Sequence, residues 1–207
     1  MARPMTRREK QASETRTDIL NAAQKLFAER GYAGTAIADI AAEAGVAVPT
    51  VYASVGAKPL LLRHLLDRVD QKAGVAELAA QLGREENPAR VLALQVDITR
   101  QVAERSGDII QILSSAAGVE PEMAEAYEAG LERHRAGARA TAKRLHALGA
   151  LPPDRSMTEA TAIIATLTSV PVYASMTATF GWSFDRCVEW LNETLAAQLL
   201  AHPRRTR

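Results

Sequence analysis

A long gap in negative charge is the part of this sequence whose residue types point most directly to chemistry. No acidic residue lies between Glu43 and Asp67, although the chain has 24 carboxylates. A surface that approaches phosphate groups excludes carboxylates, because each one would repel the phosphates at close range. The gap therefore indicates contact with a polyanion, with chance or burial of the segment as the alternative.

The N-terminal residues point the same way. Residues 1–16 carry five basic side chains and two acidic ones, a surplus of three: Arg3, Arg7, Arg8, Lys10 and Arg16 against Glu9 and Glu14. The net charge of the whole chain is only +1, which argues against a coat-like, non-specific nucleic-acid binder. We expect residues 1–14 to form a flexible basic arm, with contact to a DNA minor groove as a hypothesis. Residues 203–207 are expected to form a basic tail.

Groups that support catalysis or metal binding form no recognisable arrangement. The four histidines have no metal-ligand spacing, and Cys187 is the only cysteine. The charged residues between Glu122 and Arg139 recur at helical spacing, as expected of a solvated helix face. We therefore predict no enzyme activity, no metal and no cofactor. An all-helical enzyme or a carrier of small molecules is the alternative.

The elements that must position the acid-free stretch are all predicted to be helices. Hydrophobic residues make up 47% of the chain and aromatic residues 4%, and no segment alternates with a period of two. About nine helices are expected from apolar residues at helical spacing: residues 15–30, 35–44, 47–53, 58–69, 88–102, 108–117, 121–148, 156–180 and 183–200. Pro171 should kink the eighth of these.

Gly45 joins two short predicted helices in a manner typical of a helix-turn-helix. A glycine can adopt the left-handed conformation that lets two helices cross at a steep angle. Ala41 is small enough for close packing, and Val46 and Val51 supply the apolar wedge between the helices. Thr35 is expected to be the N-cap of the first helix, where its hydroxyl or the helix end could meet a phosphate. The pattern is typical of DNA-binding proteins.

Residues 15 to about 62 resemble the tetracycline-repressor (TetR) family of bacterial regulators, through the run ILNAAQKLFAERGYAGTAIADIAAEAGVAVPTVYASVGAKPLLL. The matching pieces are Ile19-Leu20, Ala22-Ala23, Leu26-Phe27, Gly31-Tyr32, Thr35, Ile40-Ala41, Ala44-Gly45-Val46, Thr50-Val51-Tyr52, Lys58 and Leu60. Near the C-terminus, TSVPVYASMTATFGWSFDRCVEWLNETLAAQLL is similar to the end of many such regulators. The resemblance implies an Ω-shaped homodimer, in which N-terminal helices bind operator DNA and a helical body holds a small-molecule pocket.

The resemblance also implies a set of DNA-contacting residues: Thr35, Ala47, Val48, Pro49, Thr50, Tyr52, Ser54 and Lys58. Thr50 can hydrogen-bond a phosphate or a base edge, whereas Val48 and Pro49 offer apolar contact to thymine methyl groups. Tyr52 and Lys58 match positions that contact the DNA backbone in the family. The alternatives are a core aromatic for Tyr52 and an ordinary solvated lysine for Lys58.

Three positions depart from the family pattern. Ala47 stands where a Ser or Thr often caps the recognition helix, so this helix should lack a side-chain cap. Ser54 stands where the family usually has a histidine, and Val55 replaces the aromatic residue that follows. Residues 47–53 contain no Arg, Lys, Asn or Gln, so we expect DNA to be read through Thr50, methyl contacts and DNA shape.

The C-terminal body is expected to bind an effector and to dimerise. The expected ligand-binding residues are Ile109, Ile112, Leu113, Met123, Tyr127, Leu131, His134 and Thr166. They are mainly apolar, which predicts a hydrophobic or aromatic effector. His134 lies on an apolar stripe and needs a polar partner, either a ligand or another protein group. The expected dimer-interface residues are Tyr173, Phe184, Val188, Leu191, Leu195 and Leu199.

These features predict a cytoplasmic, ligand-responsive transcription regulator, most simply a repressor that binds a near-palindromic operator as a dimer. We expect a helix-turn-helix DNA-binding domain at residues 15–57 and a helical effector-binding and dimerisation domain at residues 58–202. No apolar run approaches the roughly 20 residues of a membrane helix, and no apolar leader opens the chain. The single cysteine suits a reducing compartment. An architectural DNA-binding protein without an effector is a second alternative.

Overall fold

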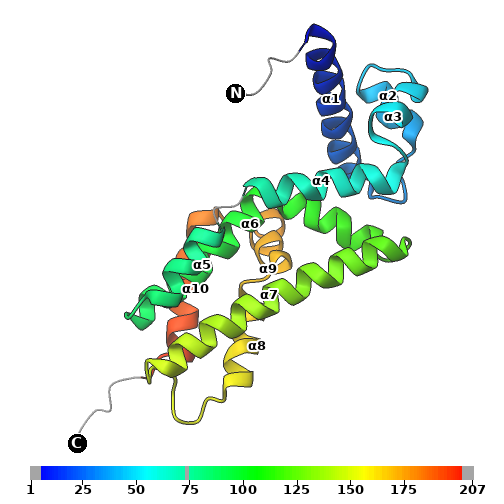
Figure 1. The fold of residues 1–207 in the computed structure, drawn as a ribbon. Coiled ribbons are helices and arrows are strands. Elements are labelled where there is room, and N and C mark those ends of the chain that lie inside the picture. The colour runs from blue at the N-terminus through cyan, green and yellow to red at the C-terminus, as the bar shows by residue number, and fades with distance from the viewer. Residues whose placement is uncertain (1–5, 73–74, 202–207) are drawn as a thin grey trace, which may run out of the picture. The chain divides into compact units, whose positions relative to one another are not determined.

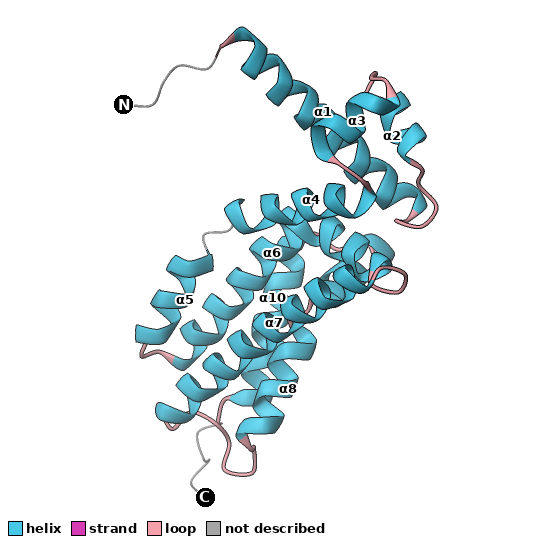
Figure 2. Cartoon of the chain, turned by 45° about the vertical axis from the view of Figure 1, so that its right-hand side comes forward, coloured by secondary structure: helices cyan, strands magenta, loops and turns pink. Residues whose placement is uncertain are grey.

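The computed structural model describes residues 6–72 and 75–201 of the chain (Figure 1). Every regular element in these residues is helical (Figure 2), which confirms the predicted all-α fold class. The helices are α1 (Arg7–Arg30), α2 (Ile37–Glu43), α3 (Val48–Val55), α4 (Lys58–Lys72), α5 (Val75–Arg84), α6 (Pro88–Ala116), α7 (Pro121–Ala147), α8 (Met157–Leu167), α9 (Val170–Ala174) and α10 (Phe184–Leu199), with a π-helical turn η1 (Ser175–Thr179). Helix α5 lies where no element was predicted.

The chain packs as two compact units. Unit 1 contains residues 1–71 and 108–127, and unit 2 contains residues 72–107 and 128–207. Helices α6 and α7 supply residues to both units, because the division falls inside each of them. The predicted domain boundary after residue 57 separates two expected functions, whereas the two units are defined by packing. The predicted domains therefore stay a prediction.

Helix α1 begins at Arg7, well before the predicted start at residue 15. Thr6 and Glu9 form a capping box, in which Thr6 Oγ1 accepts from the Glu9 N–H at 3.3 Å and Glu9 Oε2 accepts from the Thr6 N–H at 2.7 Å. Residues 7–14 are exposed, so this part of α1 depends on the cap and on residues that favour helix rather than on an apolar face. The predicted flexible arm is wrong for residues 7–14. Residues 1–5 and the predicted basic tail at 203–207 lie outside the described residues.

In unit 1, Gly45 turns the chain between α2 and α3 in the left-handed conformation predicted for it, with φ 65°. Ile40 on α2 and Val51 on α3 are fully buried, with Val46 packed against them in the same core. Helices α1 and α4, the end of α6 and the start of α7 complete this core, whose buried side chains are overwhelmingly apolar. The helix-turn-helix therefore rests on a large and closely packed hydrophobic support.

In unit 2, the predicted helix 156–180 is divided rather than kinked. Helix α8 ends at Leu167, and α9 starts anew after Ser169, with Pro171 in its first turn. Proline is well tolerated there, because its missing N–H would have no partner inside the helix. No single described helix is long and apolar enough to cross a membrane, although α8 with the bent continuation through α9 and η1 passes by length and composition.

The core of unit 2 contains a chain of buried polar contacts. Thr141 Oγ1 on α7 donates to Gln95 Oε1 on α6 at 2.8 Å. One turn along α6, Thr99 Oγ1 lies 3.4 Å from the hydroxyl of Tyr173 on α9, which donates to the Val96 carbonyl at 3.3 Å. All four polar side chains are almost fully buried. Their mutual bonds offset the cost of removing them from water.

Candidate nucleic-acid interface

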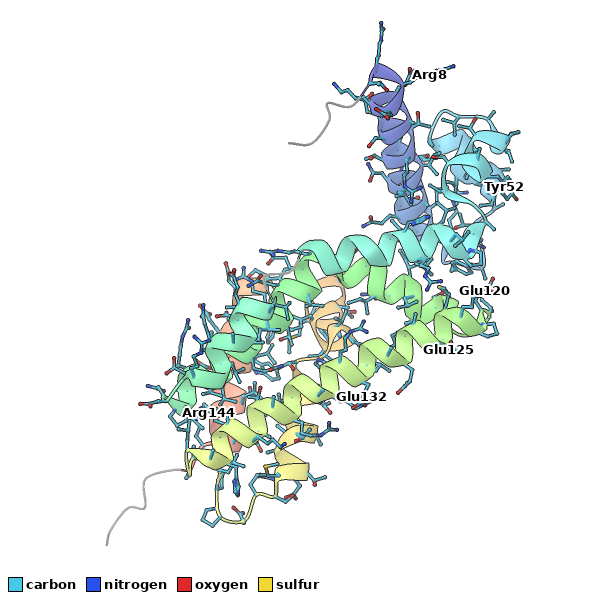
Figure 3. All side chains as sticks on the ribbon, viewed as in Figure 1. Arg8, Tyr52, Glu120, Glu125, Glu132 and Arg144 are labelled. Atoms are coloured by element: carbon cyan, nitrogen blue, oxygen red, sulfur yellow. The ribbon has the colours of Figure 1, made fainter. Side chains whose placement is uncertain are left out.

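Helix α3 presents its outer face to solvent. Val51 and Val55 are buried, whereas Val48 is 37% exposed and Tyr52 is 53% exposed. Tyr52 is labelled in Figure 3. Ala47 and Pro49 are also exposed, and Thr50 is half-buried. The alternative of a core aromatic at Tyr52 is therefore wrong. The face offers methyl groups, one ring and two hydroxyls, and the acid-free stretch ensures that no carboxylate comes from α3 itself.

The ends of α3 differ in how they are held. Ala47 is the N-cap residue and makes no side-chain cap bond, as the departure from the family pattern predicted. At the other end, Arg16 Nη1 on α1 donates to the Ser54 carbonyl at 2.7 Å. A cation at a helix C-terminus satisfies an otherwise unpaired carbonyl and complements the helix dipole. Sequence reasoning assigned Arg16 to the charge surplus and missed this role.

Thr35 does not cap α2. Ala36 occupies the N-cap position, and Asp39 accepts from the Ala36 N–H at 3.1 Å. The Thr35 side chain is 2% exposed, and its hydroxyl bonds to the carbonyls of Leu26 and Gly31 at 3.1 and 2.9 Å. The predicted cap is wrong because the hydroxyl serves the C-terminal carbonyls of α1 instead. The side chain is therefore not available to a phosphate.

Lys58, the first residue of α4, is half-buried rather than freely solvated. Its Nζ lies 4.3 Å from the centre of the Tyr32 ring and 6.0 Å from that of Phe27, which is a cation–π geometry. Burial lowers the pKa of Lys58, and the charge of Glu120 opposes that shift. The alternative of an ordinary solvated lysine is wrong.

The carboxylates of α2 are balanced by bases on α1. Lys25 Nζ lies 2.6 Å from Glu43 Oε1, and Arg30 Nη1 lies 3.9 Å from Asp39 Oδ2. These pairs are exposed and contribute little to stability. They do keep the negative charges nearest the helix-turn-helix paired within unit 1.

The eight predicted ligand-binding residues are not brought together within either unit. Five belong to unit 1, where Ile109, Ile112, Leu113 and Met123 are buried in the apolar core and Tyr127 packs against it. Leu131, His134 and Thr166 belong to unit 2. His134 Nε2 lies 2.7 Å from the Ala165 carbonyl, so its polar partner is a backbone group. Thr166 is exposed. Apolar residues at helical spacing show which side of a helix is buried, but not whether that side contacts a ligand or another helix.

The assignment to a dimer interface is wrong for four of the six residues. Tyr173, Leu191, Leu195 and Leu199 are at most 1% exposed and form the core of unit 2 within one chain. Phe184 and Val188 are half-buried and pack against that core. Helical register identified the apolar face of α10 correctly, but that face is covered by the chain's own helices.

Known proteins share sequence with the part of the chain that contains the helix-turn-helix. Residues 19–64 match the model of the family described as bacterial regulatory proteins, tetR family. Over these residues the chain is similar to the TetR family. Its N-terminal match begins at Ile19, the first buried residue of α1, and ends within α4.

Two named regulators are similar to this chain. The HTH-type transcriptional regulator TtgR of Pseudomonas putida is 34% identical over 125 residues, which cover 58% of this chain and 60% of TtgR. The chain thus matches about 60% of the length of that relative. The crystal structure of NalD, described as the secondary repressor of the MexAB-OprM multidrug efflux pump in Pseudomonas aeruginosa, is 22% identical, covers 95% of this chain and 100% of NalD, and gives a TM-score of 0.70.

A second structure carries a bound small molecule. The SmeT–triclosan complex is 20% identical, covers 91% of this chain and 92% of SmeT, and gives a TM-score of 0.65. At these identities the two structures establish the fold of this chain and nothing further.

Proposed function

We propose that this chain is a ligand-responsive, DNA-binding transcriptional regulator. It acts as a repressor, binds a palindromic operator as a homodimer in the cytoplasm, and is released by a small, mainly apolar effector. The observation that carries the proposal is the uncharged outer face of α3 with Tyr52 exposed upon it, in a domain of the TetR family. Catalysis has no part in this function.

On DNA, α3 lies in the major groove. Thr50 and Tyr52 donate their hydroxyls to phosphates or base edges, and Val48 and Pro49 contact thymine methyl groups. Ala47 and Ser54 lie at the two ends of this helix and approach the DNA backbone. Because α3 has no side chain for bidentate base reading, a large share of specificity comes from the shape and deformability of the operator.

The exposed start of α1 supplies further cations. Arg7, Arg8 and Lys10 stand on a capped helix rather than on a loose arm (Figure 3 labels Arg8). Their charges suit phosphates that flank the α3 contacts, and each released counterion adds to the salt dependence of binding. Deletion of residues 1–12 should therefore weaken operator binding, and an unchanged affinity would contradict this contact.

An effector and a second copy of the chain complete the proposal. SmeT has been crystallised with triclosan, and NalD is described as the secondary repressor of a multidrug efflux pump. Phe180, which is 70% exposed beyond η1, and half-buried Phe184 and Val188 are apolar groups that a second copy would cover.

Selection of bound sequences from a random duplex pool tests the function directly. The wild type should enrich a palindrome, and its affinity for the enriched duplex should fall steeply with salt. Thr50→Ala combined with Tyr52→Phe should weaken binding by about tenfold or more. Thr158→Ala removes an exposed hydroxyl on α8 and should have no effect.

The same experiment separates the alternatives. Absence of enrichment at low salt would overturn DNA binding and favour a small-molecule carrier or enzyme. Enrichment without palindromic symmetry would overturn the dimer. A protein that binds a palindrome but is released by no apolar compound, including triclosan as a probe, would be an architectural DNA-binding protein.

A further inference from the structure

Tyr32 lies between two oppositely charged side chains that come from distant parts of the sequence. Lys58, at the start of α4, places its Nζ 4.3 Å from the centre of the Tyr32 ring. The Tyr32 hydroxyl donates to Glu120 Oε1 at 3.3 Å. Glu120 immediately precedes α7 and is labelled in Figure 3. The three residues all belong to unit 1.

The Tyr32 ring is held firmly, so it can transmit a change on one side to the other. It is 1% exposed, and its centre lies 5.2 Å from the centre of the Phe27 ring. The Tyr32 carbonyl accepts from the Thr35 N–H at 3.3 Å, which fixes the backbone on its C-terminal side. A buried ring with these contacts has little room to rotate away from either partner.

The electrostatic effects of Glu120 reach both neighbours. Burial and then the charge of Glu120 raise the pKa of Tyr32, so the phenol stays protonated and donates its hydrogen bond. Burial lowers the pKa of Lys58, and Glu120 works against that shift by favouring the ammonium form. A carboxylate that stabilises this cation also repels any phosphate that approaches it.

We propose that Glu120 is a positioning residue for DNA binding, which holds Lys58 over the Tyr32 ring and competes with an operator phosphate for it. This inference rests on the proposed function, because it takes Lys58 as a DNA contact. Glu120 sits at the corner between α6 and α7, the two helices that run through both units. A ligand-induced change in either helix would thus reach a DNA contact without passing through α3.

Charge neutralisation at this corner is the central test. Glu120→Gln should tighten binding to the duplex recovered by selection by about three- to tenfold at low salt, because no carboxylate then competes with the operator phosphate for Lys58. Glu125→Gln removes the same charge from the exposed first turns of α7 and should change affinity less than about twofold. Equal effects of the two variants would overturn the proposal, since they would show only a change in net charge.

Dependence on Lys58 distinguishes positioning from a general structural role. Lys58→Ala should weaken binding to all sequences and lower the salt slope by about one. In the Lys58→Ala background, Glu120→Gln should have no further effect. A gain of affinity that persists without Lys58 would overturn the proposal.

The route through Tyr32 has its own readout in the free protein. The methylene protons of Lys58 next to Nζ should resonate upfield because they lie near the Tyr32 ring. Tyr32→Phe keeps the ring but deletes the bond to Glu120, so the upfield shift should be reduced, as it should be in Glu120→Gln. An unchanged Lys58 signal in both variants would overturn the positioning role. If the wild type binds no DNA, the proposed function fails, whereas this signal still tests the contact itself.

Discussion

The cores of the two units differ in how many polar side chains they bury. In unit 1 the buried hydroxyls among the described residues are those of Thr35, which serves backbone carbonyls, and Tyr32. In unit 2 the buried polar side chains are Gln95, Thr99, Ser106, Thr141 and Thr168, and several bond to one another or to Tyr173. An apolar core tolerates repacking, whereas a buried polar network specifies one arrangement as long as every bond in it is made. The two cores should therefore respond differently to the loss of a side chain.

The largest expected effects come from matched cavities in the two cores. Leu62→Ala in unit 1 and Leu191→Ala in unit 2 each remove a fully buried side chain, and each should cost about 2–5 kcal/mol of stability. If the units unfold separately, urea denaturation followed by amide exchange should show each variant losing protection mainly in its own unit. Uniform loss of protection in both variants would mean that the two cores unfold as one.

A smaller effect is expected from the polar contacts of unit 2. Thr141→Val keeps the shape of the side chain but leaves Gln95 Oε1 without its donor, at a cost of about 1–3 kcal/mol. Gln95→Leu in addition should restore part of the loss, because both polar partners are then absent. A double-mutant cycle in urea measures the coupling, and strictly additive losses would contradict a direct bond in solution.

The two capping boxes have the same hydrogen bonds, but their removal should change global stability by different amounts. Ser156→Ala removes the cap of α8, whose Ala160 and Ile164 are buried, and should cost unit 2 about 0.5–2 kcal/mol. Thr6→Ala removes the cap of an exposed helix start and should fray residues 7–14 without changing global stability. Thermal melts and amide exchange give the two readouts. A global loss in Thr6→Ala would mean that the start of α1 packs on something else.

Glycine-to-alanine changes should produce smaller shifts of the opposite sign. Gly107 in α6 and Gly137 in α7 both lie inside helices of unit 2, and a Cβ would meet Val170 at an ordinary 3.7 Å or nothing within 4 Å, respectively. Each alanine should therefore stabilise by about 0.5–1 kcal/mol. Gly107 stands where α6 passes from one unit to the other. A destabilising Gly107→Ala, measured beside Gly137→Ala, would reveal a bend there that glycine permits.

The smallest effect is expected when the pH is lowered and the capping carboxylates are protonated. Hydrogen bonds from the Thr6 backbone N–H hold the pKa of Glu9 below its ordinary 4.5, and those from Ser156 do the same for Glu159. Each cap therefore contributes fully above that ordinary value and is lost as the pH falls through the lowered pKa. Carbon chemical shifts of residues 6–10 should lose helical character below about pH 4. In Glu9→Gln, which can still cap, this pH dependence should disappear.

The helix-turn-helix could be predicted from the sequence because its determinants are local. Gly45 needs a left-handed backbone, and the burial of Val51 beside the exposure of Tyr52 follows from helical spacing alone. The start of α1 could not be predicted from periodicity, because residues 7–14 carry no apolar stripe. The local signal for this start is the Thr6–Glu9 capping box.

Residues whose roles depend on distant partners could not be predicted. Tyr32 and Lys58 were recognised only as family positions, because Glu120 is 88 residues from Tyr32 and no spacing links them. Leu191, Leu195 and Leu199 were assigned to a dimer because register shows that a face is apolar, but not which helix covers it. Both failures concern tertiary contacts, which a pattern along one helix does not contain.

The placement of the aromatic residues gives the two units separate optical signatures. Both tryptophans of the chain, Trp182 and Trp190, belong to unit 2, where their rings lie 6.1 Å apart edge to face and Arg186 stacks on Trp182. Unit 1 contains tyrosines instead, among them Tyr32 and Tyr52. Tryptophan fluorescence therefore reports on unit 2 alone, and it can stay unchanged while the helix-turn-helix of unit 1 has already unfolded.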